Sequence, residues 1–241
     1  MKERTREEQE AVAEAAERQM RRWLLMHDIE QRLERERTAE ELSNRLGPYI
    51  AISRQAGCGG GQIARLVAEK LGWELLDKKL LDFMAERYHL PRDILEFVDE
   101  TTANWLHEIF GNWLDRCVVT QEEYVDHLGK IVLLAAQHGK VVFVGRGAQF
   151  VLPRDRGLAV RIIAPVPYRI EQTMRNRSLS RDQAKRSVDE ADRGRAEFVR
   201  RYFLHDAADP LLYDLAINVE RLGPQGAASL IVGCFRERFP E

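Results

Sequence analysis

Residues 49–66 read YIAISRQAGCGGGQIARL, and this stretch decides the fold. A short apolar run is followed by a glycine cluster and then by a helical pattern with apolar residues at Ile63, Leu66 and Val67. A strand, a glycine-rich loop and a helix in this order can cradle a phosphate, because backbone N–H groups converge in the loop and the helix N-terminus adds about half a positive charge. The stretch therefore predicts a phosphate-binding loop.

The loop lacks the two side chains that do chemistry in the motif G-x-x-x-x-G-K-[ST], the lysine and the Ser/Thr. The dinucleotide fingerprint G-x-G-x-x-G also fails, since its third glycine falls on Gln62, although Asp77 lies about where a ribose-binding acid is expected. A turn that only connects strand to helix is the plain alternative, but connection does not require the entropic cost of four glycines in five positions. An oxidoreductase therefore stays open beside a phosphate-transfer protein.

The composition indicates a globular protein of a reducing compartment. A chain of 241 residues fits one large α/β domain with an appendage, and its net charge of −2 argues against a general nucleic-acid binder. Its three cysteines, Cys58, Cys117 and Cys234, are odd in number and lack paired metal-ligand spacing, which favours free thiols. The N-terminus is charged from its second residue, and no apolar run approaches about 18 residues. We therefore expect a cytoplasmic protein without a signal peptide, a membrane partner or a nucleic-acid partner.

The first 47 residues predict a long N-terminal helical arm. They are dense in Glu and Arg, and no glycine or proline interrupts them before Gly47-Pro48. Met26, Ile29 and Leu33 form a short apolar stripe, which is enough to dock but is not a sustained coiled-coil seam. The arm is expected to pack on its own domain or on a sister subunit in a homo-oligomer; a dedicated partner is the alternative.

From Tyr49 onward the pattern predicts alternating strands and helices. Strands are expected at the start of the loop stretch and at residues 73–76, 141–144, 160–164 and 215–218. Helical segments are expected at 62–71, 78–88, 91–138, 168–203 and 225–238. Short apolar strands separated by helices imply a parallel sheet covered on both faces.

Two further clusters carry charge. Arg146 stands between two glycines directly after the most apolar strand, where open α/β sheets bind ligands, and an arginine there can grip a phosphate with two hydrogen bonds. A surface turn is the plain alternative. The stretch around Asp189–Arg195 is rich in arginine at helical spacing, which is typical of a solvated helix face but also of a lid that neutralises a transferred phosphoryl group. The six histidines form no recognisable metal motif, so no metal site built by protein side chains is expected.

With these three clusters in this order, the chain resembles the cytidylate kinase-like family, relatives of bacterial cytidylate kinase among the P-loop nucleoside monophosphate kinases. The resemblance covers residues from about 48 to about 236. It is carried by ISRQAGCGGGQIA (52–64), GWELLDKKLL (72–81), VGRGA (144–148), DRGRA (192–196) and YDLAIN (213–218). It implies an α/β fold of the P-loop NTPase type, with three layers and a parallel sheet, over residues 48–241. Within this domain it implies a helical acceptor-binding insertion near 80–138 and an arginine-rich lid near 168–203.

The resemblance also implies a reaction, the Mg²⁺-dependent transfer of the γ-phosphoryl group of ATP to CMP or dCMP. Arg146 would clamp the acceptor monophosphate, Arg193 and Arg195 would close over the transferred group, and Asp77 would lie beside the acceptor. The residues implied in holding the ATP phosphates are Arg54, Gly57, Cys58, Gly59, Gly60, Gly61 and Gln62.

The sequence departs from an ordinary cytidylate kinase at the loop, where the lysine position falls on Gly60 and the Ser/Thr position on Gln62. The missing cation has three candidate replacements, Arg54, Lys78 and Lys79; Ser53 and Asp77 are candidate magnesium ligands. Cys58 stands where the family usually has serine, and it is interpreted as a near isostere rather than a redox thiol. The rival hypotheses are a catalytically weak or inactive nucleotide sensor, a dinucleotide-binding protein and a scaffold that binds no nucleotide.

Overall fold

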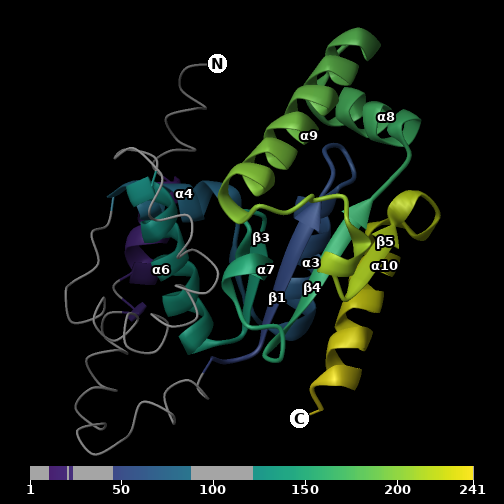
Figure 1. Cartoon of the computed structure of the whole chain (residues 1–241). Helices are drawn as coiled ribbons and strands as arrows, with labels where there is room; N and C mark the ends of the chain where they lie inside the picture. Colours follow the sequence, from purple (N-terminus) through teal and green to yellow (C-terminus); the bar gives the residue numbers. More distant parts are fainter. Residues whose placement is uncertain (1–10, 21, 24–45, 88–121, 241) are drawn as a thin grey trace, which may run out of the picture. The chain divides into compact units, whose positions relative to one another are not determined.

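The structure, a computed structural model, describes residues 11–20, 22–23, 46–87 and 122–240 (Figure 1). The chain divides into two compact units, which are described separately: one comprises Met1–Gly47 with Leu76–Gly139, and the other comprises Pro48–Leu75 with Lys140–Glu241. Most of the predicted arm, and the predicted helical stretch over residues 91–121, lie outside the described residues.

The described part of the first unit is mostly helical. Residues 11–20 and 22–23 are helical, and α4 (Lys78–Arg87) packs against α6 (Glu122–His138). The indole of Trp23, only 1% exposed, stacks on the ring of His138 with the centroids 6.1 Å apart. The arm therefore contributes a buried aromatic side chain to this unit.

The second unit is built on the five-stranded sheet, with strand order β2-β3-β1-β4-β5. The strands are β1 (Tyr49–Arg54), β2 (Glu74–Leu76), β3 (Val141–Val144), β4 (Gly157–Ile163) and β5 (Leu215–Asn218). Strand β1 runs parallel to β3 and β4, and β4 runs parallel to β5. The predicted parallel α/β architecture is confirmed.

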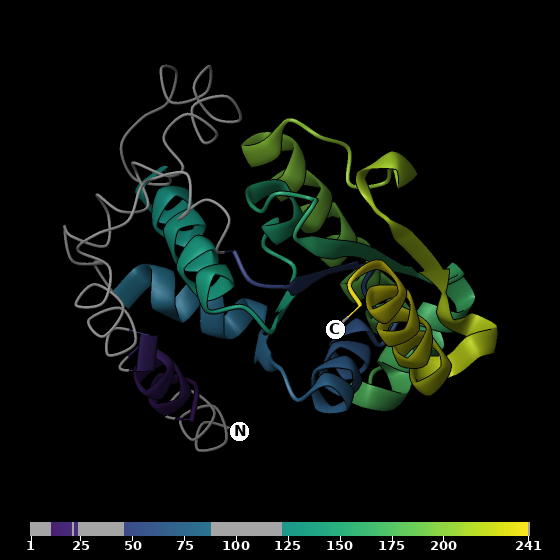
Figure 2. The same cartoon turned by 90° about the horizontal axis from the view of Figure 1, so that it is seen from below.

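Alternating residues of the central strands build the core on one face of the sheet. Ile50 and Ile52 of β1 are buried with the matching residues of β3 and β4, against α3 (Gly60–Leu71) and α10 (Val219–Arg238). These two helices contact each other and lie side by side, as Figure 2 shows. Each fully buried isoleucine contributes about 1.5–3 kcal/mol to the stability of this core.

Several boundaries differ from the sequence prediction. Strand β4 begins three residues earlier than expected, at Gly157, where a Cβ atom would lie 2.5 Å from the Tyr49 ring. The predicted helical region 168–203 forms two helices, α8 (Val166–Arg177) and α9 (Arg181–Phe203), and a capping box on Ser180 starts the second. A four-residue helix, α7 (Ala148–Val151), was not predicted.

The strand order reverses on either side of β1, since β3 flanks it on one side and β4 on the other. Open α/β sheets bind ligands outside the carboxyl ends of their strands at such a point. Helix α9 crosses this edge of the sheet in Figure 1. Within the described residues, we find no helix that combines the length and the apolar character needed to cross a membrane.

Candidate functional site

The glycine loop joins the carboxyl end of β1 to the N-terminus of α3. Gly57 and Gly59 have positive φ angles of 77° and 76°, a left-handed conformation that side chains other than glycine rarely adopt. Gly59 is the N-cap of α3 and has no side chain to cap the first N–H groups of the helix. These donors are therefore not used by a capping side chain, and the helix N-terminus favours an anion at this place.

Helix α8 packs closely on the loop at Gly57. A Cβ atom at this residue would lie 2.8 Å from Oγ1 of Thr173 and would overlap the carbonyl oxygen of Arg169. Thr173 in turn donates a hydrogen bond of 2.8 Å to that carbonyl. The glycine is therefore required both for its backbone angle and for this approach, and the contact holds the loop in one shape.

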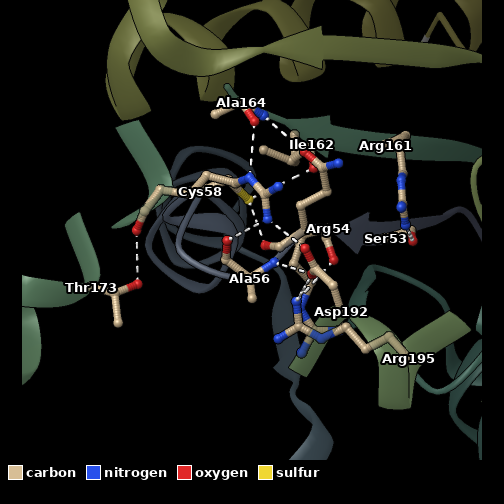
Figure 3. A network of polar contacts seen from close by, with 12 residues as sticks. Ser53, Arg54, Ala56, Cys58, Arg161, Ile162, Ala164, Thr173, Asp192 and Arg195 are labelled. Carbon is tan, nitrogen blue, oxygen red and sulfur yellow. Dashed lines mark hydrogen bonds and ion pairs between the residues drawn. The ribbon is translucent and has the colours of Figure 1, made fainter. Parts of the chain in front are cut away.

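A carboxylate of α9 ties the loop to α8. Asp192 accepts a hydrogen bond of 2.6 Å from the N–H of Ala56 and forms an ion pair with Arg169 (Figure 3). The Arg169 side chain is 7% exposed and also donates to the carbonyl oxygens of Ala164 and Ala56, at 2.9 and 3.3 Å. Its donors are thus directed at the loop backbone, at the residue that follows β4 and at one carboxylate, which makes it a positioning residue for the loop.

Arg195 lies on the same face of α9 as Asp192, because residues three apart share a helix face. Its Nη1 donates a hydrogen bond of 3.0 Å to the carbonyl oxygen of Arg54 and lies 3.8 Å from the Asp192 carboxylate (Figure 3). Burial lowers the pKa of Arg195, although an arginine stays charged at neutral pH. Arg193 is exposed and leaves the helix roughly 100° around from Asp192. The structure brings Arg195, but not Arg193, onto the loop.

The second predicted cluster forms a strained turn after β3. Gly145, Arg146 and Gly147 all have positive φ angles, of 79°, 55° and 71°. A left-handed arginine is uncommon and costs free energy, and such strain is concentrated at functional sites. A Cβ atom at Gly147 would overlap the ring of Phe203, and the Arg146 guanidinium stands 4.9 Å from the ring centroid of Phe198. The end of α9 therefore fixes where this arginine lies.

Cys58 is a packing residue of the loop. Its side chain is 1% exposed, and Sγ donates to the carbonyl oxygen of Gln55 at 3.0 Å. Burial raises the pKa of the Cys58 thiol, against the opposing influence of a backbone hydrogen bond from Gly60 and of nearby arginines. The thiol is therefore protonated at neutral pH, which agrees with its interpretation as a serine isostere and not as a redox group.

The remaining predicted residues lie as follows. Gln62 is exposed in the first turn of α3. Asp77 belongs to the other unit, where its Oδ1 accepts a hydrogen bond of 3.0 Å from the N–H of Leu80 at the start of α4. Ser53 accepts a hydrogen bond of 2.6 Å from the guanidinium of Arg161, and a hydroxyl already facing a cation does not fit a magnesium ligand. In the described parts of the chain, no group of three or more His, Cys, Asp or Glu residues could hold a metal ion.

Sequence reasoning missed the two residues that shape the loop from outside, Asp192 and Arg169. Asp192 had a readable signal, since it starts the DRGRA motif and stands three residues before Arg195. Arg169 had none, because it is one of many arginines in that region and only the packing of α8 selects it.

Comparisons with known proteins concern the family and the fold of this chain. The model of the cytidylate kinase-like family matches residues 49–221, which include the loop, the strained turn and both helices α8 and α9. A cytidylate kinase of Natronomonas pharaonis is 23% identical over 194 residues, covering 80% of this chain and 91% of that protein. The crystal structure of an uncharacterized protein from Eubacterium ventriosum aligns with a TM-score of 0.63 at 19% identity, over 78% of this chain and 98% of the other. That likeness concerns the fold, and it supports the α/β architecture described above.

Proposed function

The chain belongs to the cytidylate kinase-like family, and we propose that it is an ATP-dependent kinase that phosphorylates CMP or dCMP. The observation that carries the proposal is the collection of arginines around the uncapped glycine loop at the carboxyl edge of β1 and β3. Arg195 and Arg169 donate hydrogen bonds to the carbonyl oxygens of Arg54 and Ala56 at the loop, and Arg146 stands in the adjacent turn. Such an arrangement suits a ligand with several negative charges.

The proposed reaction is in-line transfer of a phosphoryl group. A phosphate oxygen of the acceptor bonds to the γ-phosphorus of ATP while the bond from that phosphorus to the β–γ bridging oxygen breaks, which yields ADP and a nucleoside diphosphate. The backbone N–H groups of residues 57–62 would hold the ATP phosphates. Arg146 would clamp the acceptor phosphate, and Arg195 would neutralise charge on the transferred group. Mg²⁺ would arrive bound to the phosphates of ATP and supply further positive charge.

One residue of the proposed machinery acts only if part of the chain moves. Arg193, exposed on α9, would join Arg195 when the lid closes over bound nucleotide. Asp77 would lie beside the acceptor nucleotide.

We also propose a cytoplasmic location, since the described cysteines Cys58 and Cys234 are free thiols. Whether the arm joins two copies of the chain is measured directly by the molar mass of the full chain in light scattering.

A second function is favoured by the loop itself. The loop has no lysine, and the Asp192 carboxylate already occupies the N–H of Ala56. A protein of this kind could bind a nucleotide without turning it over and act as a sensor.

One assay separates the two functions. ADP release is measured with ATP, Mg²⁺ and each of CMP, dCMP, UMP and AMP, for the wild type and for Arg146→Ala. A kinase shows turnover that falls about 10²–10³-fold in the variant, because a donor aimed at a phosphate is lost. Arg175→Ala is the matched control: this arginine is 71% exposed on α8, so its loss leaves turnover unchanged. ATP binding without turnover for any acceptor would instead favour the sensor.

A further inference from the structure

Compared with the motif G-x-x-x-x-G-K-[ST], this loop has a cation where the motif has its first glycine and a glycine where the motif has its lysine. In G-x-x-x-x-G-K-[ST] the lysine follows the second glycine, and the first glycine stands six residues before the lysine. When Gly59 is the second glycine, the lysine position is Gly60 and the first-glycine position is Arg54. The motif thus has glycine at the end of the strand and a cation on the helix, whereas this chain has the cation at the end of the strand and glycine on the helix.

The geometry explains why the two changes occur together. A Cβ atom at Gly60 would lie 2.7 Å from both the Cβ and the Cγ atoms of Arg54, closer than side-chain atoms can approach. The stem of Arg54 therefore fills the space in which a lysine at residue 60 would begin. An arginine at 54 and a lysine at 60 cannot both occupy this loop without displacing one another.

The Arg54 guanidinium is directed along the edge where the ligand is expected. A Cβ atom at Gly145 would overlap Nη1 of Arg54, so the side chain runs from the end of β1, past Gly60, to the turn that carries Arg146. Figure 3 shows Arg54 in the network around Asp192 and Arg195. Both glycines that border this path, Gly60 and Gly145, are thereby explained by one side chain.

We propose that Arg54 is the phosphate-binding cation of this loop and replaces the missing lysine, with Gly60 as its obligatory counterpart. The inference rests on the proposed function, because it needs a nucleotide phosphate at the loop. An arginine offers two parallel N–H donors to a phosphate and keeps its charge at any physiological pH. From this position it would grip the terminal phosphates of ATP beside the acceptor arginine, Arg146.

The test compares MgATP affinity, measured by isothermal titration calorimetry, among four full-length proteins: the wild type, Arg54→Gln, Gly60→Lys and the swap variant Arg54→Gly/Gly60→Lys. Arg54→Gln keeps the stem that packs along Gly60 and removes the charge, so we expect about 10- to 100-fold weaker binding. Gly60→Lys alone also weakens binding, because the lysine collides with Arg54. The swap variant should bind MgATP with an affinity within about threefold of the wild type. The lysine then has room beside residue 54 and supplies the positive charge at the loop. Arg65→Gln is the control, because it removes the same charge from an exposed position of α3 and should leave the affinity for MgATP unchanged.

The outcomes separate the two proposals. If the wild type binds MgATP and Arg54→Gln binds it equally well, Arg54 is not the loop cation and this inference is overturned alone. It is likewise overturned if the swap variant binds MgATP no better than Gly60→Lys does. If the wild type binds no nucleoside triphosphate, the proposed function is overturned and the ligand assigned to Arg54 is overturned with it. Circular dichroism melting of each protein verifies folding, and Arg54→Met replaces Arg54→Gln if the latter does not fold.

Discussion

Removal of the Asp192 carboxylate tests whether the loop is held in place by the ion pair across α8 and α9. In Asp192→Ala the Ala56 N–H loses its acceptor and Arg169 loses the one carboxylate shown to pair with it. The arginine side chain is 7% exposed, so its charge cannot turn to solvent without opening the packing around Gly57.

The expected loss of stability in Asp192→Ala follows from the burial of the ion pair between Asp192 and Arg169. Breaking a fully buried ion pair by removing one partner costs about 3–5 kcal/mol, because the remaining charge is left buried. Asp192 is 29% exposed, and Arg169 keeps its hydrogen bonds to two carbonyl oxygens, so we expect the lower end of that range, about 3 kcal/mol. For a chain of this length the melting temperature should fall by about 6–12 °C. Asp192→Asn should lower the melting temperature by less, since the amide oxygen can still accept a hydrogen bond from the Ala56 N–H.

Differential scanning calorimetry at pH 7 measures the effect, with Asp189→Ala as the matched control. Asp189 stands one turn earlier on the same helix and pairs with Lys185, but both side chains are well exposed, at 45% and 60%. Its removal should leave the melting temperature unchanged, because exposed ion pairs contribute little. A melting temperature of Asp192→Ala within 2 °C of this control would refute the reasoning.

Three further predictions concern single residues. Cys58 should resist iodoacetamide in the native protein at pH 8 and react only after unfolding, because burial raises the pKa of its thiol. Peptide mass spectrometry measures the extent of labelling, and rapid labelling of the native protein would contradict the prediction. Burial alone would raise the pKa of Asp214, but hydrogen bonds from the Ala159 N–H and two arginines outweigh it and lower the pKa. The contribution of Asp214 to the free energy of unfolding is therefore present above the unfolded-state pKa of about 3.9. It is lost as the pH falls through the pKa of the folded state. Urea unfolding of Asp214→Asn should thus show a loss of about 1–2 kcal/mol at pH 7 that shrinks toward pH 3, and an equal loss at both would count against this account. Gly147→Ala should lower the melting temperature by several degrees, since a methyl group there overlaps Phe203 and the φ angle is +71°; an unchanged melting temperature would show that the ring moves freely.

Local signals in the sequence predicted much of the fold. The strands at 141–144 and 215–218 have the predicted bounds, because a short apolar run between glycines or turn residues has few other structures available. Helix α7 was missed, since four residues carry no periodicity. The early start of β4 was missed because Gly157 joins the strand only through its close approach to Tyr49, a residue 108 positions away.

The candidate site was likewise predictable from the sequence only in part. The glycine loop and the arginine between two glycines could be read from the sequence, because their residue types restrict the backbone over a few positions. The choice between Arg193 and Arg195 could not, since it depends on which face of α9 turns toward the loop. The same holds for Asp192 and Arg169, which meet only because α8 and α9 pack together.

By itself, the sequence determined that this protein has a parallel α/β domain with a glycine-rich loop between a strand and a helix, and that this loop lacks the lysine of the motif G-x-x-x-x-G-K-[ST]. Those properties follow from short-range patterns of apolar residues and glycines. Only the tertiary structure decided which side chain fills the space of that lysine: the stem of Arg54 lies against Gly60 because β1 and α3 meet at the loop, and the volume there admits one side chain. Side-chain contact across a turn depends on the path of the backbone in three dimensions, which residue order alone does not specify.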